Sequence, residues 1–264
     1  MQRLAIFVSL FFNFVTYAQA QIELPLEVED FATVSFLGFG DSVTYGLGDG
    51  FPVGSFVEEF ESAGAPGGYP RRLSAFLGVP TMNSGVPGEK FISVGLSRFP
   101  GVAIGSGANL IAFMEGANDA LRLESSATYR HGVQKIINTA TVLGKAIVLI
   151  TIPPTCCNHI GSRPFISSFN DQLRDLARIN SVTLADVAFA WGTTCENQAE
   201  CELFNLPDGL HPNTKGYDVM AQTILATLLG VDIFVEGKAA ELEEKLALPA
   251  GTIIVRPVPG SAEL

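Results

Sequence analysis

Short, uniformly apolar runs alternate with longer amphipathic segments along most of this chain. The runs are short enough for buried strands and lie at residues 33–37, 80–83, 109–114, 145–152 and 181–187. Helical periodicity, with apolar residues three or four positions apart, occurs over 69–77, 129–143, 165–179 and 214–229. Strands that are apolar along their length and separated by helices favour a parallel sheet covered on both faces. The pattern therefore predicts an α/β fold with a five-stranded parallel sheet.

Composition is consistent with one globular domain. The chain has 264 residues, of which 47% are hydrophobic and only 16% charged. This length is sufficient for a large core, and this composition excludes a disordered chain. The formal net charge is −11, which makes nucleic acid or an anionic membrane an unfavourable partner.

The first 20 residues have the pattern of a secretory signal peptide. Arg3 precedes an apolar segment over 4–15, and Ala18-Gln19-Ala20 resembles a cleavage site. An uncleaved anchor is the alternative, but Asn13 interrupts an apolar run that is already short for a membrane span. We therefore predict a secreted or periplasmic protein with no stable membrane insertion after the signal is cleaved.

Four cysteines fit an oxidising compartment, where they would form disulfides that pin loops. They are Cys156, Cys157, Cys195 and Cys201, and three pairings are possible. A metal site that joins the vicinal pair to His159 is the alternative, but the spacing matches no common ligand pattern. We therefore expect no metal and no cofactor.

Small and polar residues follow the predicted strands. In parallel sheets, ligands bind beyond the carboxyl ends of the strands, so these residues are expected to share one edge. The clusters are Gly40-Asp41-Ser42, "NSGVPG" at 83–88, "EGAND" at 115–119 and "PDGLHPN" at 207–213.

These residue types together suit acyl transfer. A serine hydroxyl such as that of Ser42 is a weak nucleophile and needs a base, for which His211 is the natural candidate. Asp208, three residues earlier, can orient the imidazole ring of His211. The backbone N–H groups of Ser42 and Gly85 and the side-chain amide of Asn118 can stabilise the oxyanion that forms.

Four blocks of this sequence resemble the SGNH hydrolase superfamily, also called GDSL esterases and lipases. The blocks are Gly40-Asp41-Ser42, with Val43 where leucine is common, Asn83-Ser84-Gly85-Val86-Pro87-Gly88, Gly116-Ala117-Asn118-Asp119 and Asp208-Gly209-Leu210-His211. The resemblance implies a flavodoxin-like three-layer α/β/α sandwich over about residues 33–230. It also implies a triad of Ser42, Asp208 and His211 and an oxyanion hole of Ser42, Gly85 and Asn118.

Other functions are less favoured by the sequence. Ser42 alone could be an ordinary helix N-cap. Nucleotide binding would suit the glycines at 38 and 40, but Val43 occupies the third glycine position and no P-loop occurs. An α/β-hydrolase is disfavoured because no G-x-S-x-G occurs. A non-catalytic member of the same fold that binds a glycan or lipid remains open.

The substrate is predicted only by class. We expect a carboxylic ester with a small-to-medium acyl group, and an acetyl ester on a sugar is the alternative. Phe51, His159 and Trp191 are candidate substrate-binding residues. Residues 21–32 are expected to be a lead-in, and 231–264 a C-terminal extension. The extension combines a charged helix at 239–248 with an edge strand or extended tail at 251–260, packed against the domain.

Overall fold

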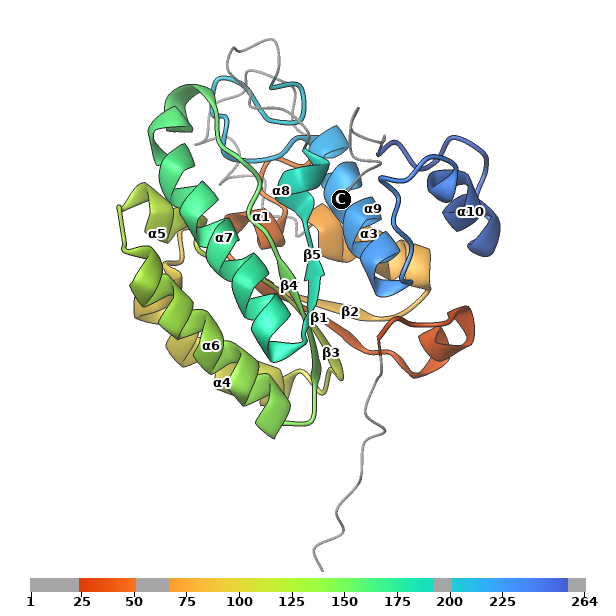
Figure 1. Ribbon diagram of the computed structural model, residues 1–264, viewed down its shortest axis with the longest axis horizontal. Helices are drawn as coiled ribbons and strands as arrows, with labels where there is room; N and C mark the ends of the chain where they lie inside the picture. Colours follow the sequence, from red (N-terminus) through yellow and green to blue (C-terminus); the bar gives the residue numbers. More distant parts are fainter. Residues whose placement is uncertain (1–23, 51–66, 192–200, 256–264) are drawn as a thin grey trace, which may run out of the picture.

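A five-stranded parallel sheet forms the centre of the computed structural model, which describes residues 24–50, 67–191 and 201–255 (Figure 1). The strand order is β2–β1–β3–β4–β5, and each neighbouring pair is parallel. The strands are β1 (Phe36–Gly40), β2 (Thr81–Gly85), β3 (Leu110–Met114), β4 (Ala146–Ile150) and β5 (Thr183–Ala185). This is the flavodoxin-like order, in which the chain reverses its direction of winding at β1. The predicted fold is confirmed.

Helices cover both faces of the sheet and complete a three-layer sandwich (Figure 1). One face packs against α1 (Ser42–Tyr45), α3 (Gly68–Leu77), α8 (Val187–Ala190) and α9 (Thr214–Leu228). The other packs against η2 (Phe91–Gly95), α4 (Leu96–Gly105), α5 (Ala117–Leu121), α6 (Ser126–Val142) and α7 (Arg163–Asn180). Successive residues of β3 belong to the two cores in turn, because side chains alternate along a strand. Both sides of β3 are therefore apolar.

Two differences from the sequence prediction have a local cause. β1 extends to Gly40, beyond the predicted end at residue 37, because its glycines permit close packing rather than ending the strand. A Cβ on Gly40 would stand 1.9 Å from Thr44 Oγ1 and 2.2 Å from the Met114 carbonyl oxygen. η2 and α4 were not predicted, because Pro100 and several glycines obscure the helical periodicity there.

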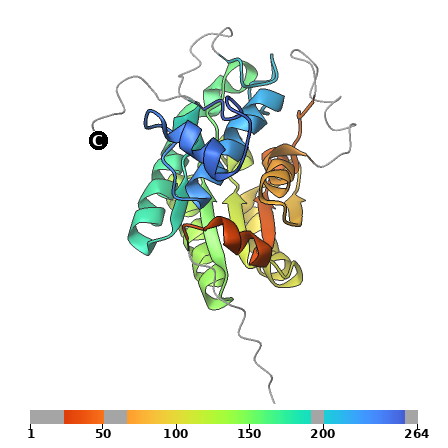
Figure 2. The same ribbon diagram turned by 90° about the vertical axis from the view of Figure 1, so that its right-hand side faces the viewer.

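Both flanking segments pack against the α9 side of the sandwich (Figure 2). Leu26, just before the short helix η1 (Val28–Thr33), is buried, and its N–H donates to the Leu228 carbonyl. The predicted charged helix is α10 (Lys238–Lys245). Residues 252–255 have no regular secondary structure. The backbone N–H groups of Ile253 and Ile254 donate to the side chains of Glu243 and Gln222, respectively. Across the described ranges, no helix has the length and apolarity needed to cross a bilayer.

Candidate active site

Ser42 is the first residue of α1 and lies directly beyond the carboxyl end of β1. Asp41 caps this helix, because its carboxylate accepts a hydrogen bond from the N–H of Val43 (2.9 Å). Gly46, in the left-handed conformation, ends the helix after one turn. The strand, the cap and the single turn together fix the serine at the edge of the sheet.

A hydrogen-bonded chain links Ser42 to the loop before α9. His211 Nε2 lies 2.9 Å from Ser42 Oγ, and His211 Nδ1 lies 3.0 Å from Asp208 Oδ2. All three residues are buried. This geometry allows the imidazole to take the serine proton while the carboxylate stabilises the resulting imidazolium.

The Asp208 carboxylate is held in its charged form. Its Oδ2 also accepts the backbone N–H groups of Leu210 (3.1 Å) and His211 (2.7 Å). Burial alone would raise the pKa of Asp208, but the hydrogen bonds and charge of His211, together with His159, hold that pKa below its ordinary value.

Asn205 connects the loop that carries Asp208 and His211, the histidine loop, to the turn that follows α1. Its side-chain amide donates to the carbonyls of Gly48 (3.0 Å) and Pro212 (3.0 Å), and its backbone N–H donates to the carbonyl of His211 (3.0 Å). Asn213 then caps α9 by accepting the N–H of Gly216 (3.1 Å). The sequence analysis missed Asn205, since nothing in its local pattern shows which backbone carbonyls it meets.

His159 also contacts this loop. It lies in the short helix η3 (Cys157–Ser162), and its Nδ1 is 2.8 Å from the Asp208 carbonyl oxygen. Because a carbonyl can only accept, we assign the proton to Nδ1. The same nitrogen is 3.4 Å from Asp208 Oδ1. Asp208 thus has one histidine at each carboxylate oxygen.

The predicted backbone donor at Gly85 is already engaged. Its N–H donates to Asn83 Oδ1 (2.9 Å). A Cβ at this position would lie 2.1 Å from the Tyr45 nitrogen and 2.8 Å from the Asp41 carbonyl oxygen. The absence of a side chain at Gly85 therefore lets the end of β2 pack closely against α1.

Asn118, the second residue of α5, lies beside the turn that contains Gly88. Asn118 Nδ2 donates to the Glu89 carbonyl (2.9 Å), which leaves the second hydrogen of the amide for another acceptor. This bond holds the turn closed by Glu89 N–H and the Val86 carbonyl (3.1 Å). Gly88 occupies this turn with φ of +75°, and its N–H donates to no acceptor in the part of the chain that the structure describes. In the sequence, the second glycine of "NSGVPG" was the feature that could have indicated this backbone donor.

A profile of the GDSL-like Lipase/Acylhydrolase family matches residues 39–219, a range that contains the Ser42–His211–Asp208 chain. The protein belongs to this family. It is therefore an ester-bond hydrolase of the GDSL type, whose expected substrates are small-molecule esters.

Solved GDSL-type structures share the fold at low sequence identity. The acetylxylan esterase Axe2 from Geobacillus stearothermophilus is 20% identical, with a TM-score of 0.60 over 74% of this chain and 94% of that one. A lipase/acylhydrolase from Enterococcus faecalis is 22% identical, with a TM-score of 0.58 over 75% and 96%. LAE5, a hydrolase from the metagenome of Lake Arreo, Spain, is 21% identical, with a TM-score of 0.59 over 74% and 94%. No curated protein matches the sequence.

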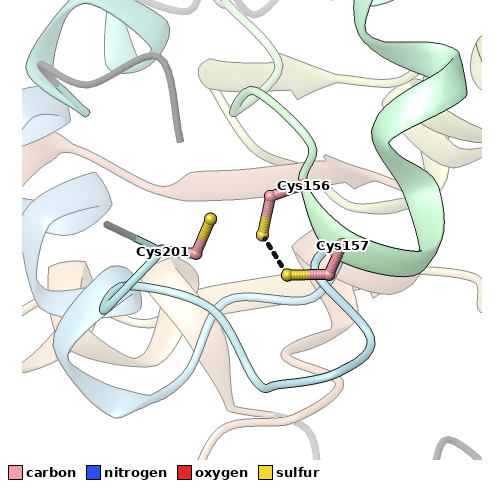
Figure 3. Close-up of side chains that lie close together, drawn as sticks. All are labelled: Cys156, Cys157 and Cys201. Atoms are coloured by element: carbon pink, nitrogen blue, oxygen red, sulfur yellow. Dashed lines mark hydrogen bonds between the residues drawn. The ribbon is translucent and has the colours of Figure 1, made fainter. Parts of the chain in front are cut away.

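Three cysteines converge behind the histidine loop (Figure 3). The sulfur atoms of Cys156, Cys157 and Cys201 all lie within 4.8 Å of one another, and those of Cys156 and Cys157 are 3.0 Å apart. Among the described cysteines no disulfide joins one to another, and Cys195 lies outside the described residues. The third member of the cluster is thus Cys201, whereas the metal alternative had paired the vicinal cysteines with His159.

Of the other two candidate substrate-binding residues, the structure describes only Trp191. Trp191 is only 3% exposed and packs against Phe204 in the core, with ring centroids 5.1 Å apart. The ring of Trp191 is therefore taken up by core packing, and its role in substrate binding stays a prediction. Phe51 lies outside the described residues.

Proposed function

We propose that this hydrolase is a serine esterase that forms an acyl-enzyme on Ser42. The observation that supports this most directly is the buried hydrogen-bonded chain from Ser42 Oγ through His211 to Asp208. A serine used only as a helix cap would not need a histidine at 2.9 Å that is itself bonded to a carboxylate.

In the proposed mechanism, His211 Nε2 accepts the hydroxyl proton as Ser42 Oγ attacks the ester carbonyl. The tetrahedral intermediate collapses when the same imidazole gives this proton to the leaving alcohol. Water then attacks the acyl-enzyme, again with His211 as base, and releases the acid. Asp208 keeps Nδ1 protonated and stabilises the imidazolium in both steps.

The oxyanion would be stabilised by the N–H of Ser42, the side-chain amide of Asn118 and one backbone N–H from the end of β2. We predicted Gly85 for this last position. The hydrogen bonding favours Gly88, since the Gly85 N–H is bonded to Asn83 and the Gly88 N–H has no acceptor in the described chain. Asn118 and the Gly88 turn are joined through the Glu89 carbonyl, so both donors would move as one unit.

The proposed substrate is a carboxylic ester with a small-to-medium acyl group. An acetyl group on a sugar is the second candidate, which is favoured by the shared fold with an acetylxylan esterase. A member of the fold that only binds a glycan or lipid is the non-catalytic alternative.

We also propose that the protein is exported and loses residues 1–20. The convergence of Cys156, Cys157 and Cys201 behind the histidine loop supports disulfide formation there in an oxidising compartment. Non-reducing peptide mapping of the secreted protein would test both points, because it reports the mature N-terminus and any cysteine pairing together. Four unmodified thiols or an intact N-terminus would contradict them.

The central experiment is hydrolysis of p-nitrophenyl esters, from acetyl to palmitoyl, by residues 21–264. Ser42→Ala should abolish turnover, and Ser167→Ala, an exposed position on α7, should not change it. The chain-length profile then separates acetyl esterase from lipase activity. Turnover by the Ser42→Ala variant equal to that of the wild type would exclude Ser42 as the nucleophile. If the folded protein hydrolysed none of these esters and did not deacetylate acetylated xylan, the binding-only alternative would be favoured.

A further inference from the structure

Glu115 is a buried acid whose charge the surrounding structure does not balance. It follows β3 directly and lies three residues before Asn118, which is on α5. Its exposure is 0%, and if it is ionised neither carboxyl oxygen has a hydrogen-bond donor. An unpaired carboxylate is strongly disfavoured in such a site because it has lost its hydration, so a carboxyl group there is expected to take up a proton.

The groups around Glu115 disfavour its charge further. Three acids face it, namely Asp41 at the start of α1, Glu89 before η2 and Asp119 on α5. Tyr129 on α6 donates its hydroxyl to the Glu115 backbone carbonyl (2.8 Å), and so does not neutralise the side chain. Burial, followed by the charge of Asp41 and the contact with Glu89, raises the pKa of the Glu115 carboxyl well above its ordinary value.

Glu89 is the natural acceptor for this proton. A Cβ on Gly95 would stand 3.2 Å from Glu89 Oε1 and 3.3 Å from Glu115 Oε1, so the two carboxyl groups converge on one glycine. Two ionised carboxylates have no proton to share, whereas a protonated Glu115 donates to Glu89. Arg98 on α4 donates to both carboxylate oxygens of Glu89, with Nε 2.9 Å from Oε2.

We propose that Glu115 is a neutral positioning residue for the oxyanion site: its carboxylic acid proton bonds the Glu89 carboxylate and thereby fixes the loop that holds the Asn118 amide. The last link is the bond from Asn118 Nδ2 to the Glu89 carbonyl (2.9 Å). Four segments thus meet at Glu89, because Arg98 also donates to the Ser84 hydroxyl (2.7 Å) and carbonyl (3.1 Å) at the end of β2. The catalytic part of this proposal rests on the proposed esterase function, and the protonation of Glu115 does not.

Loss of this proton at alkaline pH has a defined consequence. It places a negative charge beside Glu89, Asp41 and Asp119, close to where the oxyanion forms, and removes the hydrogen bond to Glu89. Turnover should therefore decline on the alkaline side. Glutamine at position 115 cannot ionise and can still donate an N–H to Glu89, so it should preserve the loop and remove the decline.

The test compares Glu115→Gln with Glu115→Leu, and uses Glu241→Gln, an exposed position on α10, as the matched control. With p-nitrophenyl acetate, the glutamine variant should keep kcat within about threefold and lose the alkaline decline, and the leucine variant should lower kcat by about tenfold or more with little change in KM. A glutamine variant as slow as the leucine variant, or one with an unchanged alkaline decline, would overturn the positioning role.

Infrared spectroscopy provides a readout that is independent of activity. A buried protonated carboxyl group has a C=O stretch that ionised carboxylates lack, and this band should be present in the wild type at neutral pH. It should be missing from Glu115→Gln and retained in Glu241→Gln. If the band is unchanged in Glu115→Gln, Glu115 is not the protonated group. This result would count against the proposal even if the protein hydrolysed none of the esters. Should the leucine variant fail to fold, the glutamine pH profile and the infrared band still decide the question.

Discussion

At the scale of single residues, the site depends on how each polar atom is already bonded. Gly85 and Gly88 are three positions apart in the same block, yet only the Gly88 N–H lacks an acceptor in the described chain. The sequence analysis found Ser42, Asp208 and His211, whose residue types define their chemistry. It could not distinguish the two glycines, because that choice depends on the side chain of Asn83.

Asn118→Ala tests the oxyanion site at this scale. The variant loses the amide hydrogen proposed for the oxyanion and the bond to the Glu89 carbonyl. We expect kcat for a p-nitrophenyl ester to fall by about a hundredfold, with the fold retained. Asn138→Ala, an exposed asparagine on α6, is the control. An unchanged kcat in Asn118→Ala would remove this residue from the site.

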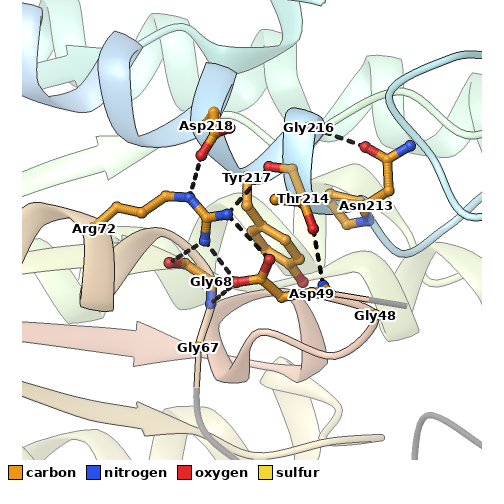
Figure 4. Close-up of polar contacts among 12 residues, drawn as sticks. Gly48, Asp49, Gly67, Gly68, Arg72, Asn213, Thr214, Gly216, Tyr217 and Asp218 are labelled. Atoms are coloured by element: carbon orange, nitrogen blue, oxygen red, sulfur yellow. Dashed lines mark hydrogen bonds and ion pairs between the residues drawn. The ribbon is translucent and has the colours of Figure 1, made fainter. Parts of the chain in front are cut away.

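At the scale of elements, Arg72 connects the segment that follows Ser42 to the segment that follows His211 (Figure 4). From α3 it binds both carboxylate oxygens of Asp49 (2.6 and 3.0 Å) and Asp218 on α9 (2.5 Å). It also donates to the carbonyls of Gly68 (3.1 Å) and Thr214 (3.2 Å). Asp49 follows the nucleophile helix, and Thr214 lies three residues after His211. Periodicity predicted α3 and α9 separately but not this link between them.

Arg72→Met should weaken this junction. It leaves the Asp49 carboxylate, whose side chain is only 16% exposed, without its bidentate partner. The free energy of unfolding measured in urea should fall by about 2 kcal/mol, and kcat should fall because Ser42 and His211 are less firmly aligned. Arg71→Met, at the neighbouring exposed position of the same helix, should change neither quantity by much. Equal stability of both variants would contradict a structural role for Arg72.

At the scale of the whole molecule, the sheet brings the ends of three strands together between two apolar cores. The same burial that forms these cores encloses acidic groups near Ser42. Burial, only partly offset by the bond from Val43 N–H and the charge of His211, raises the pKa of Asp41 from 3.8 to about 6. The folded protein therefore disfavours ionisation of Asp41 more than the unfolded chain does.

This difference makes stability depend on pH. The stabilising contribution of protonated Asp41 is fully present below about pH 4 and is lost as the pH rises through about 6. The change from 3.8 to about 6 corresponds to about 3 kcal/mol. Asp41→Asn, which keeps an oxygen for the Val43 N–H, should raise the free energy of unfolding at pH 7 by up to this amount and change it little at pH 4.

Urea unfolding at both pH values would measure this effect. Asp171→Asn, an exposed position on α7 with 66% of its side chain accessible, is the control and should alter stability little. An Asp41→Asn variant that is less stable than the wild type at pH 7 would show that the charged form of Asp41 stabilises the fold, contrary to this expectation.

The sequence by itself determined the fold class, the five-strand count and the family, and it supplied the candidates for nucleophile, base and orienting acid. These follow from local patterns, since strand and helix periodicity and the residue types after each strand are all written within short segments. Only the tertiary structure decided which backbone N–H is available, that His159 reaches Asp208, that Trp191 is buried, and that Glu115 faces Glu89. Each of these depends on a contact between segments far apart in the chain, and whether a polar group is satisfied depends on the partner that folding brings to it.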